Sequence, residues 1–224
     1  MPIDVSDLLS AATKAHSNFP TNVRSGEFIR EFESYCAHEL MRAGLPPSPL
    51  PVGRFSREKV AFHLRTGRYV LGGYYAKEVD VVLTADDSGP LLAVSLKSIM
   101  RSIANNVNNR WEETVGDAAN LHSRFPMLSL GYLMIVPYVG YRDKKGKREE
   151  IIDANDQPTA LARDLERKLR ALRGRDDSTD LPSYFEEVAL CVLDLRKGRK
   201  VAMHPSFPEG DLRIEMSCTG FGGR

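Results

Sequence analysis

The stretch KEVDVVLTADDSGPLLAVSLKS, from Lys77 to Ser98, decides the fold. Its two apolar runs flank the turn-like segment TADDSG, a pattern that predicts two strands joined as a hairpin. Each run carries one charge, Asp80 in the first and Lys97 in the second. A charge at the edge of an apolar strand is costly unless it is paired or holds a metal. Asp80 and Lys97 therefore form either a buried ion pair or part of a functional site.

The segments around this hairpin predict alternating helices and strands. Helices are expected at 6–16, 25–44, 99–125 and 158–174, and strands at 69–84 (bent at Gly72-Gly73), 91–97, 128–137, 186–195 and in LRIEM, 212–216. This order favours an α/β fold in which helices flank both faces of one mixed central β-sheet. The expected organisation is a single domain over 1–224, with N-terminal helices at 1–45, a core at 69–195 and a C-terminal strand and tail at 196–224.

Composition excludes several classes of protein. Apolar residues make up 42% and charged residues 27% of the 224 residues, as in globular domains. The longest apolar run, LGYLMIVPYVGY, is too short to span a bilayer. The first residues lack the pattern of a secretory signal. We therefore expect a cytoplasmic protein with no membrane partner. Cys36, Cys191 and Cys218 have no CxxC spacing, which argues against a zinc site or a disulfide framework.

Other motifs and the net charge narrow the choice of function. There is no GxSxG elbow and no GK[ST] after the glycines of GRYVLGGYY, so neither a serine hydrolase nor a nucleotide cofactor is indicated. The net charge is only +1, but basic residues cluster in RDKKGKRE, ERKLRALRGR and RKGRK. These clusters are either local positive patches or ordinary solvated segments.

An Asp, a second carboxylate and a Lys form the set that metal-assisted hydrolysis of a phosphodiester needs. Carboxylate oxygens bind hard Mg²⁺, and a nearby cation orients the attacking water or stabilises developing charge. Fourteen residues separate Asp80 from the tripeptide SLK, which ends in Lys97, and NNVNNRWEETVGDAANLH follows. On these residues the sequence resembles the PD-(D/E)xK nuclease superfamily and its type II restriction endonucleases. The resemblance implies a restriction-endonuclease-like fold.

The motif departs from that family at one position. Ser95 stands where the family usually has Asp or Glu, but a restriction-enzyme subgroup with SxK takes the missing acid from the following helix. In that subgroup the acid comes a little over a dozen residues after the Lys. Glu112 and Glu113, 15 and 16 residues after Lys97, come close to this spacing, and we rank Glu113 before Glu112. A further carboxylate often comes from the N-terminal helix, where Glu33 ranks before Glu31 and Glu39. Each of these glutamates has an alternative interpretation as a surface residue.

The resemblance implies a role for each matched residue. Asp80, Glu113 and the carbonyl of Leu96 would hold Mg²⁺, Lys97 would position the water, and Ser95 would line the site. The polar side chains of the next helix suit phosphate and base-edge contacts, with buried amides as the alternative; the candidates are Arg101, Asn105, Asn108, Asn109 and Arg110.

The resulting expectation is a Mg²⁺-dependent endonuclease that cuts double-stranded DNA, as a type II restriction enzyme does. Resemblance to restriction enzymes implies a homodimer, because two sites facing opposite strands need a two-fold axis. Two alternatives remain: a non-catalytic nucleic-acid-binding protein with a decayed nuclease site, and a less specific nuclease of repair, recombination or defence.

Overall fold

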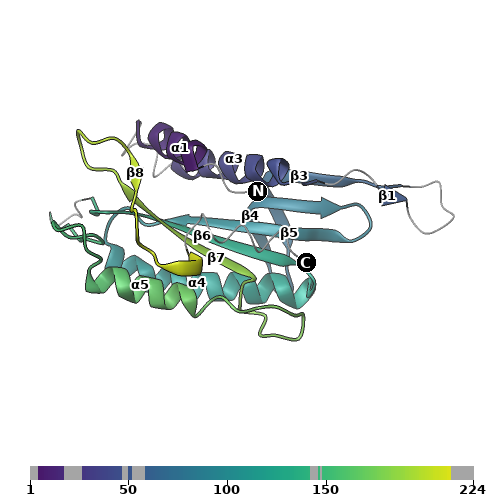
Figure 1. Cartoon of the computed structure of the whole chain (residues 1–224). Helices are drawn as coiled ribbons and strands as arrows, with labels where there is room; N and C mark the ends of the chain where they lie inside the picture. The colour runs from purple at the N-terminus through teal and green to yellow at the C-terminus, as the bar shows by residue number, and fades with distance from the viewer. Residues whose placement is uncertain are drawn as a thin grey trace.

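The computed structural model describes residues 5–17, 27–46, 50–51, 59–141, 146 and 148–212. Its centre is a six-stranded sheet in the order β3-β4-β5-β6-β7-β8, drawn in Figure 1. The strands are β3 (Phe62–Leu71), β4 (Ala76–Ala85), β5 (Gly89–Ser98), β6 (Ser129–Pro137), β7 (Glu187–Asp194) and β8 (Ala202–Met203). A separate two-stranded sheet pairs β1 (Leu50–Pro51) with β2 (Lys59–Val60).

The sheet is mixed, as the sequence predicts. β3, β4 and β5 form an antiparallel meander, β5, β6 and β7 run parallel, and β8 returns antiparallel to β7. Parallel neighbours need a crossover connection, and two helices supply it: α4 (Ile103–Arg124) between β5 and β6, and α5 (Ala160–Arg170) between β6 and β7. The predicted hairpin of the Lys77–Ser98 stretch is confirmed, with Ala85 paired to Gly89 at its turn.

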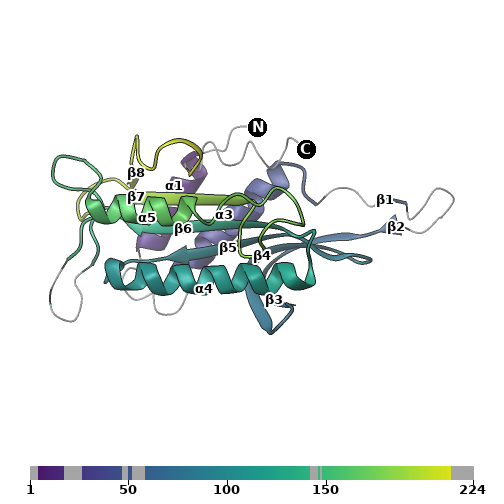
Figure 2. The same ribbon diagram turned by 90° about the horizontal axis from the view of Figure 1, so that it is seen from below.

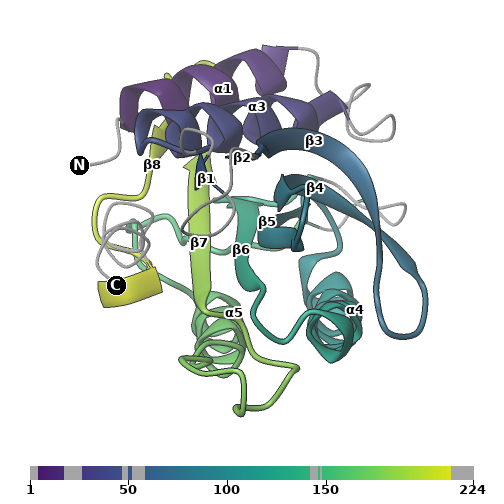
Figure 3. The same ribbon diagram turned by 90° about the vertical axis from the view of Figure 1, so that its right-hand side faces the viewer.

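Helices cover both faces of the sheet, which confirms the α/β fold. The helices α1 (Val5–Ser17) and α3 (Glu27–Arg42) lie on one face, and α4 and α5 lie on the other, as Figures 1 and 3 show. In Figure 2 α4 and α5 lie next to each other across the front of the sheet.

Each face has its own hydrophobic core, and β6 alternates between the two. Tyr132 and Met134 belong to the core under α4 and α5. Leu133 and Ile135 belong to the core under α1 and α3. A strand buried on both faces needs a continuous apolar run, which β6 and β7 have.

The predicted single strand over 69–84 is wrong. The chain forms two antiparallel strands, β3 and β4, and Gly72 and Gly73 lie in the turn between them. The turn packs so closely on α4 that a Cβ at Gly72 would lie 2.3 Å from Nδ2 of Asn120. The two glycines therefore mark a close approach of two segments, and β3 extends the meander to Phe62, before the predicted start of the core.

Helix boundaries also differ from the sequence predictions. Helix α4 begins at Ile103 and not at 99, because the amide of Ile99 still donates to Ile135 of β6 at 3.0 Å and Ser102 turns the chain with a positive φ. The helix predicted at 158–174 is α5, capped by Thr159, whose hydroxyl accepts a hydrogen bond from the amide of Ala162. The strand predicted at 212–216 lies, beyond Leu212, outside the described residues.

Candidate functional site

The site is built where β4 and β5 separate. Their ladder ends at the pair Val81 and Val94, although β4 starts at Ala76 and β5 continues to Ser98. Beyond that pair, Asp80 takes the place of a backbone partner, since its Oδ2 accepts a hydrogen bond from the amide of Leu96 at 2.7 Å. The amide and carbonyl of one strand residue point to the same side. The carbonyl of Leu96 therefore faces the same gap as the Asp80 carboxylate.

Burial and charge act against each other on Asp80. Burial raises the pKa of the carboxyl group, and the charge of Lys97 and the amide of Leu96 only partly oppose this rise. A hydrogen bond from the Ser95 side chain lowers the pKa of Asp80 as well. Lys97 and Ser95, two residues apart on β5, thus both act on the Asp80 carboxylate.

Glu33 approaches the same gap from α3. Burial raises the pKa of Glu33, the negative charge of Asp80 raises it further, and Lys97 lowers it. The two other N-terminal candidates pair elsewhere: Glu31 binds Lys14 at 2.8 Å and Glu39 binds Arg42 at 3.0 Å. Of the three glutamates, the structure therefore brings Glu33 to Asp80.

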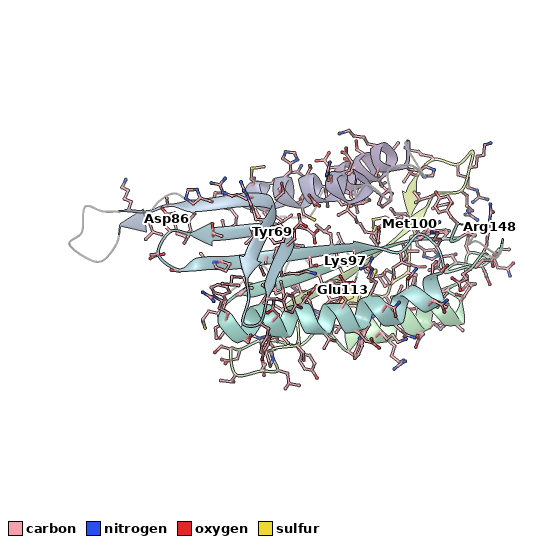
Figure 4. The ribbon with its side chains drawn as sticks, turned by 180° about the vertical axis from the view of Figure 1, so that it is seen from behind. Tyr69, Asp86, Lys97, Met100, Glu113 and Arg148 are labelled. Atoms are coloured by element: carbon pink, nitrogen blue, oxygen red, sulfur yellow. The ribbon has the colours of Figure 1, made fainter. Side chains whose placement is uncertain are left out.

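Helix α4 brings Glu113, and not Glu112, to this region. Glu113 pairs with Arg110 of its own helix and lies 3.8 Å from the Nζ of Lys77 on β4. Burial alone would raise the pKa of Glu113, but Arg110, Lys97 and Lys77 outweigh burial and hold this pKa below its ordinary value. Glu112, by contrast, is exposed. Figure 4 shows Lys97 and Glu113 on neighbouring elements of the same side of the molecule.

Sequence reasoning missed two charged residues beside the gap. Asp117, one helical turn after Glu113, is buried and binds the Nζ of Lys77 at 2.5 Å. Lys77, Asp117 and Ser95 also line one small cavity between β4, β5 and α4. One signal could have found Asp117, since the i, i+4 spacing puts Asp117 on the Glu113 face of the helix.

The five predicted DNA-contact residues have different surroundings. Asn105, Asn109 and Arg101 are exposed. Asn108 accepts a hydrogen bond from Lys168 of α5 at 2.6 Å, and Arg110 pairs with Glu113. Asn108 is exposed as well, so four of the five candidates are exposed near the N-terminal end of α4, while Asn108 and Arg110 have partners within the chain.

Oxygen donors around the gap suit a hard cation. Magnesium keeps several waters and needs only one or two carboxylates, so Asp80, Glu113 and the Leu96 carbonyl have the chemistry it prefers. Within the described ranges, however, no three His, Cys, Asp or Glu side chains converge as a metal-binding group. The carboxylates of Asp80 and Glu113 instead bind an amide and basic side chains.

Comparison of the chain with known protein families, with curated proteins and with solved structures finds no match in any of the three. Among the helices that the structure describes, none combines the length and the apolar character that a bilayer crossing requires.

Proposed function

We propose that the chain is a Mg²⁺-dependent endonuclease that hydrolyses phosphodiester bonds in double-stranded DNA, of the type II restriction kind. The observation that carries this proposal is the gap between β4 and β5, in which Asp80 binds the amide of Leu96. The negative charge of Asp80 raises the pKa of Glu33 on one helical layer, and Lys97 lowers the pKa of Asp80, Glu33 and Glu113. An acid-rich gap with a lysine whose charge acts on all three acids fits hydrolysis of a charged phosphodiester better than a simple ion pair does.

Each residue has a role in the proposed reaction. Asp80, Glu113 and the Leu96 carbonyl would hold the ion, which would polarise the scissile phosphate and lower the pKa of bound water. Lys97 orients the attacking water and stabilises charge that develops on the phosphate. Ser95 holds the Asp80 carboxylate in the gap through its hydrogen bond.

The same resemblance supports a homodimer that cuts both strands and leaves 5′-phosphates. A duplex presents two scissile phosphates related by a two-fold axis, so two copies of one site meet them symmetrically. The monomeric structure supplies one such site, on the gap between β4 and β5.

One observation favours a second candidate, a nucleic-acid-binding protein without catalysis. Ser95 replaces the usual acid, and Glu113 is paired with Arg110 and Lys77. If these pairs persist in the presence of Mg²⁺, the protein would bind DNA and leave it intact. A nuclease with little sequence specificity, acting in repair, recombination or defence, is the alternative within the enzymes.

The deciding experiment is incubation of supercoiled plasmid with the protein, in Mg²⁺ and in EDTA. We expect cleavage by the wild type only with Mg²⁺ and loss of cleavage in Lys97→Ala. Lys59→Ala, at an exposed position of β2 outside the basic clusters, is the matched control and should cut normally. Binding without cleavage in every case would establish the second candidate. Discrete fragments from long DNA support the restriction type, and a smear supports the less specific nuclease.

A further inference from the structure

Exposed apolar side chains gather on one turn of the molecule. Of the seven large apolar side chains exposed in the described residues, four lie between Tyr69 and Tyr75, where Tyr74 is 79% and Tyr69 is 72% exposed. The other two of the four are Leu71 and Tyr75. Large apolar side chains that are exposed close together in one short segment indicate an interaction site. We call residues 65–75 the aromatic hairpin.

The aromatic hairpin is held firmly against α4. The side chain of the buried Asn120 accepts hydrogen bonds from the amides of Tyr74 (2.9 Å) and Tyr75 (3.1 Å) and donates to the carbonyl of Tyr75. The amide of Gly73 donates to the Asn120 carbonyl at 2.7 Å. Figure 3 shows β3 and β4 curving together beside α4. These hydrogen bonds fix the backbone of the turn, from which the side chains of Tyr69 and Tyr74 lie largely in solvent.

The aromatic hairpin is also joined to the candidate active site. The phenol of Tyr75 donates to Oδ1 of Asp117 at 3.1 Å, and Lys77, two residues on, binds both Asp117 and Glu113. A Cβ at Gly116 would lie 4.0 Å from the Tyr75 oxygen, so Tyr75 lies over α4 between the helix and solvent. Tyr75 of the aromatic hairpin therefore contacts Asp117, which shares the partner Lys77 with Glu113 of the site.

Charge on the same strand points to a polyanionic partner. Arg65 and Arg68 are exposed on β3, four residues and one residue before Tyr69. Basic side chains bind phosphates, and apolar side chains beside them wedge between base steps of duplex DNA. We propose that the aromatic hairpin enters a groove of duplex DNA beside the scissile phosphate, with Tyr69 and Tyr74 against the bases and the two arginines on the backbone. This inference rests on the proposed function.

A second copy of the chain fits this surface less well. A stable protein interface buries on the order of 800 Å² per partner, from about 20–30 residues a side. The aromatic hairpin offers four exposed apolar side chains on a single turn. One or two inserted side chains are enough to unstack a base step. The size of the patch therefore favours DNA.

The test measures duplex affinity in the Lys97→Ala background, in which cleavage is removed. We expect Tyr74→Ala and Tyr69→Ala each to weaken binding about tenfold, the loss typical of one aromatic contact with a base, while Tyr74→Phe binds almost normally. The slope of log K against log salt should stay unchanged in both tyrosine variants and fall by about 1 in Arg68→Ala, because only the arginine neutralises a phosphate. A duplex carrying 2-aminopurine should brighten on binding wild type and not Tyr74→Ala.

Met41→Ala is the matched control, since Met41 is 49% exposed on α3, in the other helical layer. The tyrosine variants should unfold at the wild-type temperature, because their rings contact solvent. Wild-type affinity in Tyr74→Ala and Tyr69→Ala overturns the inference. So does sedimentation that shows the tyrosine variants as monomers and the wild type as a dimer, which makes the patch an interface between copies. Cleavage by tyrosine variants that keep Lys97 leaves the proposed function standing in both cases, whereas a wild type that neither binds nor cuts DNA removes both proposals.

Discussion

Replacing Asn120 with alanine should loosen the junction between the aromatic hairpin and α4. The Asn120 side chain is fully buried and makes three hydrogen bonds to the turn, at 2.9, 3.1 and 3.1 Å. A hydrogen bond in a folded protein contributes about 1 kcal/mol net, so the three together contribute about 3 kcal/mol. Alanine is the better helix former by roughly 0.5 kcal/mol, which offsets a little of that loss. The free energy of unfolding should therefore fall by about 2–3 kcal/mol.

Urea unfolding followed by circular dichroism measures that change, and a thermal scan should show a midpoint lower by about 5–10 °C for a chain of this size. Hydrogen exchange of the Tyr74 and Tyr75 amides should accelerate before the core strands open. Asn109→Ala is the control, because Asn109 is exposed on the same helix; it should be neutral or slightly stabilising. An Asn120→Ala protein as stable as wild type, with slow exchange at both amides, would refute the hydrogen-bonded junction.

Three further predictions concern the site and the turn. Burial raises the pKa of Asp80 above 3.8, so the folded chain keeps this proton at pH values where the unfolded chain has lost it, and the free energy of unfolding falls as pH rises through that window. Asp80→Asn should therefore unfold at a higher temperature than wild type at pH 7 while losing cleavage. Equal unfolding midpoints would contradict this. Ser95→Asp puts a second carboxylate beside Asp80, so its melting temperature should fall without metal and recover with added Mg²⁺; a midpoint insensitive to Mg²⁺ would rule out an ion at this gap. Gly72→Ala should lower the free energy of unfolding by about 1–3 kcal/mol, because its Cβ would lie 2.3 Å from the buried Asn120. Gly116→Ala is the control, since its Cβ would have its nearest neighbour at 4.0 Å, and it should be neutral or stabilising in the same denaturant assay.

Local patterns in the sequence account for much of the fold. The charged hairpin, the buried strands and the helix that ends before Gly44 were all readable, because apolar periodicity and turn residues act over a few neighbouring positions. The same reasoning joined β3 and β4 into one strand. It failed there because the two glycines are explained by a helix about 45 residues later in the chain, through Asn120.

The candidate site divides in the same way. The motif itself singled out Asp80, Lys97 and Ser95, and the spacing after Lys97 left Glu112 and Glu113 open. Lys77 and Asp117 went unnoticed, since their 2.5 Å contact joins a strand to a helix that the sequence separates by 40 positions. Glu33 was ranked first among three glutamates, but its approach to Asp80 depends on how α3 lies on the sheet.

By itself, the sequence determined the alternation of strands and helices and the presence of one acid and one lysine on adjoining apolar runs. Only the tertiary structure decided that β4 and β5 separate beyond the pair Val81 and Val94. It also decided that Asp80 accepts a hydrogen bond from the Leu96 amide in this gap, and that Glu113 rather than Glu112 lies near Lys77. The physical reason is the range in the sequence over which each feature is determined. Side-chain periodicity is a property of one segment, whereas the separation of two strands and the facing of a helix depend on packing against segments far away in the chain.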